Sequence, residues 1–159
     1  MSGKIEAETP QSRLARSGLT LPPAAQAVGN YAAFVLHGGL LVISGQLPRR
    51  ADGSLLTGRA GADLTLEQAQ EAARLCALNI LAQANAALGD LSRIARLLRL
   101  NGFVQATPEF GDHAMVMNGA SDLIATVLGA PGVHTRVAVG AHSLPLNAAT
   151  EIDALFAVT

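Results

Sequence analysis

Residues 65–89 read TLEQAQEAARLCALNILAQANAALG, and this stretch decides the fold. Thr65 and Gln68 have the spacing of a capping box, in which each side chain bonds the other residue's backbone N–H, so a helix is expected to begin here. Gly89 supplies a C-terminal stop. Between them, small or apolar residues recur at helical intervals: Ala69, Ala73, Cys76, Ile80 and Ala84. A long helix with such a stripe is suited to close packing on a β-sheet.

Two β-rich runs precede this helix, at residues 32–36 (AAFVL) and 40–44 (LLVIS). They flank His37-Gly38-Gly39, and two such runs around a glycine-containing turn predict a hairpin. The second run is apolar without alternation, which is typical of a strand covered on both faces. A polar loop from 48 to 61 then leads to the helix.

The elements after the long helix complete the pattern. Residues 94–105 predict a strand with a bulge at Gly102, and residues 118–128 predict a helix that opens at Asn118 and closes at Gly129. Two final strands are expected at 135–141 and 151–158. The order ββ, α, β, α, ββ predicts an α+β fold, with one β-sheet and two helices packed on one face.

Length and composition indicate a single domain that associates with copies of itself. A chain of 159 residues can bury its own core, and we expect residues 1–20 to form a peripheral arm or short helix and residues 21–159 to form the domain. Half of the residues are hydrophobic and only 14% are charged. So apolar a chain is expected to hide part of its surface in an oligomer.

Charge and aromatic content argue against nucleic acid as a partner. The formal net charge is −1, aromatics make up 3% of the chain, and there is no Trp, whereas nucleic-acid binding uses clustered cations and stacking rings. Arg93, Arg96 and Arg99 do recur at a three-residue spacing. Strict strand alternation would place Arg96 on the opposite sheet face from the other two, so they make no common patch.

Other site classes also lack support. The single Cys76 forms no intrachain disulfide, lies in the apolar stripe and is expected to be a packing residue. The four histidines lack ligand spacing, so we expect no metal and no cofactor. No leader peptide and no apolar stretch of about 18 residues is present, which favours a cytoplasmic protein with no membrane contact.

Five polar residues interrupt otherwise apolar elements and are the candidate site residues: Tyr31, Ser44, Asn118, Arg136 and Glu151. The guanidinium of Arg136 is a planar fork that can grip a carboxylate through two parallel hydrogen bonds. A carboxylate such as Glu151, placed among apolar neighbours, has its pKa raised by desolvation and so becomes useful as a general acid or base near neutral pH.

Structural roles for these residues are the alternatives. Arg136 and Glu151 could form an ion pair, Tyr31 could be a packed ring with a satisfied hydroxyl, and Asn118 could be a helix N-cap. His134 could act as an accessory acid–base group or simply occupy a turn. Spacing alone does not decide between these roles.

A family resemblance extends these inferences from single residues. It covers residues 22–158 and rests on motifs in a fixed order: GNY at 29–31, SGQLP at 44–48, Asn118, Arg136, LP at 144–145 and EIDA at 151–154. Together these motifs resemble the reactive intermediate deaminase family, RidA or YjgF, whose members were earlier labelled translation-inhibiting endoribonucleases.

The resemblance implies a chorismate-mutase-like fold assembled as a homotrimer, with a cleft between each pair of neighbouring subunits. It also implies cofactor-free hydrolysis of a 2-imino acid, formed from its enamine tautomer, to a 2-keto acid and ammonia. In that reaction Arg136 would bind the carboxylate of the small metabolite and Glu151 would position or activate water. Tyr31, Ser44, Asn118 and Ala138 would line the cleft. Ala138 stands where many family members have Cys, so thiol chemistry at that position is excluded.

Two other functions remain open at this point. A ligand-binding or regulatory trimer would keep the cleft without turnover, and the departures from the family pattern near Arg136 are compatible with it. An endoribonuclease is the third, disfavoured by net charge and the scarcity of aromatics.

Overall fold

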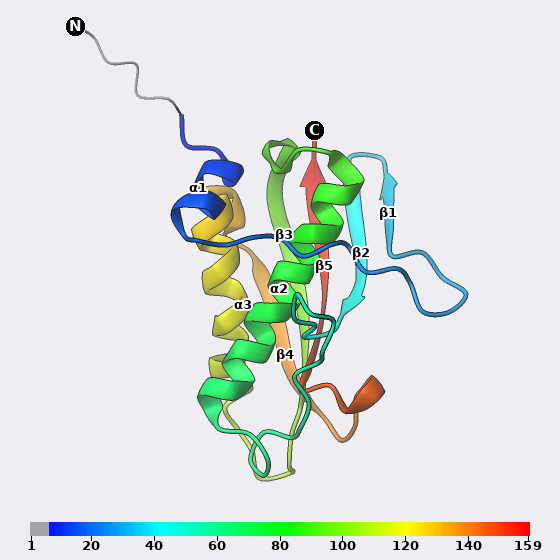
Figure 1. The fold of residues 1–159 in the computed structure, drawn as a ribbon, viewed down its shortest axis with the longest axis vertical. Helices are drawn as coiled ribbons and strands as arrows, with labels where there is room; N and C mark the ends of the chain where they lie inside the picture. Colours follow the sequence, from blue (N-terminus) through cyan, green and yellow to red (C-terminus); the bar gives the residue numbers. More distant parts are fainter. Residues whose placement is uncertain (1–6) are drawn as a thin grey trace, which may run out of the picture.

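The computed structural model describes residues 7–159 as two layers, a five-stranded sheet with helices packed on one of its faces (Figure 1). This confirms the α+β class. In chain order the elements are α1 (Pro10–Arg16), β1 (Phe34–His37), β2 (Leu40–Gln46), α2 (Leu66–Leu88), β3 (Ile94–Gln105), α3 (His113–Leu128), β4 (Thr135–Ala141) and β5 (Thr150–Val158). Short 3-10 turns occupy 91–93, 130–132 and 145–147. Helix α1 lies within residues 1–20, where a peripheral arm or short helix was expected.

The strand order in the sheet is β1-β2-β5-β3-β4. The last strand of the chain therefore lies in the middle, antiparallel to both β2 and β3, while β4 pairs in parallel with β3 at one edge. Strand β1 forms the other edge through its antiparallel hairpin with β2. Strand β5, which carries Glu151, is thus separated from β4, which carries Arg136, by the whole width of β3.

Helix α2 forms as its sequence predicts. Thr65 and Gln68 make the reciprocal capping box, and Gly89 ends the helix in the left-handed region at φ 76°. All five residues of the predicted stripe are fully buried. Within the stripe the sulfur of Cys76 lies 3.2 Å from the hydroxyl of Thr150, and burial raises the pKa of the thiol to about 12. The packing role of Cys76 is confirmed.

Helix α3 begins earlier than predicted. It starts at His113 and not at Asn118, which lies in its interior, so the N-cap interpretation of Asn118 is wrong. The apolar residues that precede Asn118 continue the helical pattern, and Val116 and Met117 pack in the core. Gly119 lies against α2, where a Cβ atom would come within 2.9 Å of the backbone carbonyl carbon of Gln70. The two helices therefore touch closely on the sheet.

The two faces of the sheet differ sharply. On the face covered by α2 and α3, Leu41, Leu97 and Phe156 are fully buried. On the other face, here called the open face, Leu40 and Val42 are 41% and 48% exposed. The expectation that β2 is covered on both faces is therefore wrong for the chain alone, because nothing in residues 7–159 packs over that side.

Strand β3 carries irregularities where regular pairing was expected. The register shifts between Ile94 and Arg96 and again between Leu97 and Arg99, whereas Gly102 pairs regularly with Ile152. Because of the second shift, Arg96 and Arg99 lie on the same open face, and strict alternation misplaced them. A Cβ at Gly102 would run into the side chain of Met117, so this glycine allows α3 to approach the sheet.

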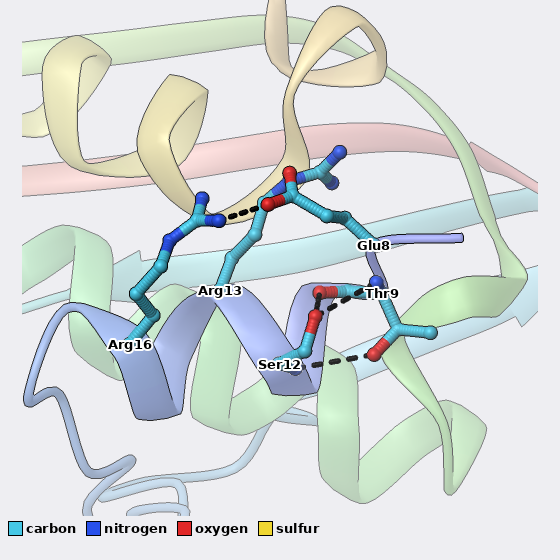
Figure 2. Close-up of polar contacts among 5 residues, drawn as sticks. All are labelled: Glu8, Thr9, Ser12, Arg13 and Arg16. Atoms are coloured by element: carbon cyan, nitrogen blue, oxygen red, sulfur yellow. Dashed lines mark hydrogen bonds and ion pairs between the residues drawn. The ribbon is translucent and has the colours of Figure 1, made fainter. Parts of the chain in front are cut away.

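Helix α1 carries a small local polar network around its N-terminal end (Figure 2). Thr9 and Ser12 form a second capping box, and Glu8 accepts hydrogen bonds from Arg13 and Arg16. The side chain of Leu14 is buried in the core. From α1 the chain crosses α2, where the side-chain amide of Gln83 donates a 2.7 Å hydrogen bond to the carbonyl of Ala25, and it reaches β1 at the far edge.

Candidate functional site

A cavity of about 430 Å³ lies at the end of β2, between the segment that leads into β1 and the start of β5. Its lining includes three of the sequence-predicted site residues, Tyr31, Ser44 and Glu151. Gln46, Asn79 and Leu146 also line it. The structure therefore brings together residues that are more than a hundred positions apart in the chain.

Glu151 is the acidic group of this cavity. It is the second residue of β5 and pairs with Phe103 on the open face of the sheet. Its carboxylate is half-buried, and burial, with a smaller contribution from the like charge of Asp153, raises its pKa. Within residues 7–159 it has no hydrogen-bond or ion-pair partner. The carboxyl group of Glu151 therefore keeps its proton to a higher pH than it would in water, as required of a general acid or base.

Gly45 explains why Glu151 fits where it does. A Cβ atom at this position would lie 3.0 Å from the carboxyl carbon of Glu151 and closer still to one of its oxygens. The backbone of Gly45 has no positive φ, so the glycine is needed for space rather than for conformation. The SGQ motif thus has a physical reason: its central residue makes room for the carboxylate.

Ser44 and Tyr31 belong to one connected segment. The hydroxyl of Ser44 donates a 2.7 Å hydrogen bond to the carbonyl of Ala32, which ties β2 to the residue next to Tyr31. The ring of Tyr31 is 56% exposed, so the alternative of a packed ring is wrong for the isolated chain. Ser44 therefore stabilises the position of this segment, and the ring of Tyr31 lines the cavity.

Buried side-chain amides support the cavity wall, and they were not predicted as site residues. Gln46 donates to the carbonyl of Ser44 at 3.0 Å, and Asn79 donates to the carbonyl of Arg49 at 2.9 Å. Both amides, like that of Gln83, are almost fully buried. The sequence signal that could have identified Asn79 is its position among the Ala and Leu residues of α2, because a buried amide must find hydrogen-bond partners.

The remaining predicted residues gather elsewhere, between α3 and the edge strand β4. Arg136 pairs with the buried Leu100, which places it on the helix-covered side of the sheet. Its guanidinium donates to the hydroxyl of Ser121 and to the carbonyl of Ala114, each at 3.0 Å. Ser121 is also 2.9 Å from the Nε2 atom of His134. Ser121 was not predicted as a site residue.

Asn118 and Ala138 complete this second group. Asn118 lies on α3 at helical spacing between Ala114 and Ser121, the two residues that Arg136 contacts. Among the described residues its side chain makes only a 4.0 Å contact, with the sulfur of Met115, so the amide remains available. Ala138 follows Arg136 on the same side of β4 and packs partly against the core. A smaller cavity of about 320 Å³ lies beyond it, lined by His113 and His142.

The predicted site residues therefore form two groups that one chain keeps apart. Glu151 lies on the open face of β5, and Arg136 lies on the covered face of β4 at the sheet edge. The alternative of an ion pair between them is not found among the described residues, since Arg136 bonds α3 instead. Across residues 7–159, no cluster of three metal-ligating side chains occurs, and no helix is long and apolar enough to cross a membrane.

Comparison with known proteins identifies the family. Residues 11–158 match the family described as "YjgF/chorismate_mutase-like, putative endoribonuclease", and the chain belongs to this family. It is 47% identical over 155 residues to Protein TCP17 of Trypanosoma cruzi, across 97% of this chain and 94% of TCP17.

Two solved structures show where the chain stands within the family. The crystal structure of Atu1372 from Agrobacterium tumefaciens is 52% identical, with a TM-score of 0.87 over 95% of this chain and 94% of that one. RidA from an Antarctic Psychrobacter is 26% identical, with a TM-score of 0.59 over 87% and 94% of the two chains. The chain thus belongs to a branch that has diverged from RidA while keeping its fold.

Proposed function

We propose that this protein is a cofactor-free hydrolase that converts 2-imino acids to 2-keto acids in a cleft shared by neighbouring subunits of a trimer. Water adds to the carbon of the C=N bond, the C–N bond breaks, and the nitrogen leaves as ammonia with the protons taken from water. The net change is one imine and one water giving one ketone and one ammonia. No electrons are exchanged, so the reaction needs no redox partner.

The observation that carries this proposal is the half-buried carboxylate of Glu151, which lies in a cavity of about 430 Å³ and has no partner among residues 7–159. A carboxylate with a raised pKa can take a proton from attacking water and return it to the leaving nitrogen. Tyr31 lines the same cavity, and its hydroxyl would contact the substrate there. Arg136 would hold the substrate carboxylate and so fix the imine carbon in position.

The need for a second subunit follows from the separation of the two groups. Glu151 and Arg136 act on one small substrate only if the α3–β4 edge of one subunit meets the cavity of another. The open face of the sheet favours such an assembly, because it exposes apolar side chains that water solvates poorly: Leu40, Val42, Phe103, Val137 and Val139.

The endoribonuclease in the family description is the less favoured function for this chain. Arg96 and Arg99 share the open face, which would suit phosphate contacts. However, Arg99 donates to Asn101 at 2.8 Å, and Asn101 donates to the carboxylate of Asp153 at 2.7 Å. Arg99 is therefore already engaged in a hydrogen-bond network within the chain, and few aromatics are available for base stacking.

Ammonia release from freshly generated 2-imino acids tests the proposal. Glu151→Gln keeps the shape of the side chain but cannot exchange a proton, so turnover should fall about 10²–10⁴-fold while the protein stays folded. Asp153→Asn is the matched control, because it removes the neighbouring carboxylate on the same strand face and should keep activity within a few-fold. Full activity in folded Glu151→Gln would reject the catalytic role. Binding of 2-keto acids without ammonia release by the wild type would favour the non-catalytic binding trimer.

A further inference from the structure

Ser121, His134 and Arg136 form one hydrogen-bonded unit between α3 and β4. The Oγ atom of Ser121 lies 2.9 Å from Nε2 of His134 and 3.0 Å from Nη1 of Arg136. The Nδ1 atom of the same histidine lies 2.6 Å from the carbonyl oxygen of Gly132. All three side chains are partly exposed, so a ligand can reach them from the edge of the sheet.

The partners fix where the protons lie. A carbonyl oxygen only accepts hydrogen bonds, so Nδ1 of His134 carries a proton. In the neutral imidazole, Nε2 is then a bare acceptor, and the hydroxyl of Ser121 must donate its only proton to it. Arg136 donates to an oxygen lone pair of the same hydroxyl. While His134 is neutral, Ser121 therefore has no proton to offer a ligand.

Protonation of His134 reverses this arrangement. Both ring nitrogens are then donors, and Nε2–H points at the oxygen of Ser121. With its lone pairs occupied by His134 and Arg136, the hydroxyl must turn its proton outward. It becomes an additional donor beside the guanidinium, and the imidazolium adds a second positive charge.

We infer that Ser121 is a further ligand of the carboxylate held by Arg136, and that His134 controls whether its hydroxyl proton is available. This inference rests on the proposed function in one respect, namely that Arg136 binds a carboxylate. Affinity for a 2-keto acid should therefore be higher at about pH 5 than at about pH 8, because protonation of His134 frees the hydroxyl proton. The ligand itself stays ionised throughout this range.

The other charged and titratable groups near this unit are few. From β4 the neighbour is Arg136, which remains charged, and from α3 the neighbour is Asp122, which is exposed and follows Ser121. His113, at the start of α3, packs edge-to-face on Phe110. Glu151 of an adjoining subunit would also face the ligand, so its titration must be removed from the experiment.

The test is calorimetric binding of pyruvate to the full-length protein in the Glu151→Gln background, from about pH 8 to about pH 5. Affinity should rise about tenfold across this range, as expected for one added charge-assisted hydrogen bond to a partly exposed group.

His134→Gln keeps a neutral hydrogen-bonding side chain but cannot be protonated, and it should abolish the rise. Ser121→Ala should do the same and also weaken binding, whereas Ser121→Thr should restore both. His142→Gln is the control histidine variant and should keep the pH dependence.

Two outcomes overturn the inference: a pH-independent affinity in the parent protein, or a pH dependence that persists in folded His134→Gln. A purely structural role for Ser121 and His134 would lower the melting temperature of the variants without flattening the pH profile. The proposed function fails separately. A protein that binds pyruvate with this pH dependence but releases no ammonia from imines would reject the deaminase and support the assignment of Ser121 and His134.

Discussion

The two faces of the sheet have the same strands but opposite relations to solvent. Leu41 on the covered face is fully buried, and its neighbour Leu40 on the open face is 41% exposed. The candidate site shows the same division, since Arg136 belongs to the covered side at one edge and Glu151 to the open side near the centre. The covered face stabilises the chain, and the open face together with the sheet edge is the surface that the proposed trimer would use. In the proposed trimer, each chain would contribute Glu151 to one cleft and Arg136 to another.

The largest predicted effect is a difference in stability between variants on the two faces of the sheet. Leu41→Ala removes buried methyl groups and leaves a cavity, so the free energy of unfolding should fall by about 2–5 kcal/mol. Leu40→Ala makes the same chemical change one residue away. In dilute, dissociated protein it should change stability by no more than about 0.5 kcal/mol. Chemical denaturation of both variants at low protein concentration measures the difference.

The same pair also tests the assembly. Leu40→Ala should shift dissociation of the trimer to higher protein concentration, as followed by light scattering on dilution, because Leu40 lies on the face that we expect other subunits to cover. Equal losses of chain stability in the two variants would show that the open face is covered within the chain. A wild type that stays monomeric at micromolar concentration would remove the shared cleft.

The next prediction concerns the guanidinium group of Arg136. Arg136→Lys keeps the charge, but an ammonium cannot make two parallel hydrogen bonds to a carboxylate while also bonding Ser121 and Ala114. Binding of 2-keto acids should weaken by about 1.5–3 kcal/mol, measured by calorimetry. Arg59→Lys, at a partly exposed loop position where the guanidinium donates to the carbonyl of His142, is the matched control and should bind normally. Unchanged affinity in Arg136→Lys would show that the arginine only joins α3 to β4.

Local signals in the sequence predicted most of the fold. The capping box at Thr65, the stop at Gly89 and the stripe through Cys76 are short-range patterns, and the structure confirms each of them. Strand β4 also has its predicted bounds. The start of α3 was misplaced because Asn118 is a residue type favoured at a helix N-cap, whereas Asp112, of an equally favoured type, occupies that position.

Features that depend on pairing between strands were not predictable. The shifts in β3 that bring Arg96 and Arg99 to one face are properties of its pairing with β5, and no glycine or proline marks them. The bond between Arg136 and Ser121 likewise depends on how α3 lies over the edge strand. The candidate residues could be named from the sequence, but their division into two groups could not.

The smallest predicted effect is the change in melting temperature caused by Glu151→Gln, on the open face of the sheet. Burial, and then the charge of Asp153, raises the pKa of Glu151 in the folded chain. A raised pKa means that this group stabilises the fold most in acid, below its unfolded value of about 4.3, and that the contribution is lost as the pH rises through the folded value. Glu151→Gln should therefore melt slightly above the wild type at neutral pH, and the difference should shrink in acid. If Arg136 of a neighbouring subunit instead compensates the charge of Glu151 in the assembled trimer, the melting temperature of Glu151→Gln should be lower than that of the wild type at high protein concentration. It should be higher than that of the wild type only on dilution. Melting curves at two protein concentrations and two pH values distinguish these cases. A variant less stable than the wild type under all four conditions would mean that a cation within the chain already pairs with Glu151, contrary to the structure.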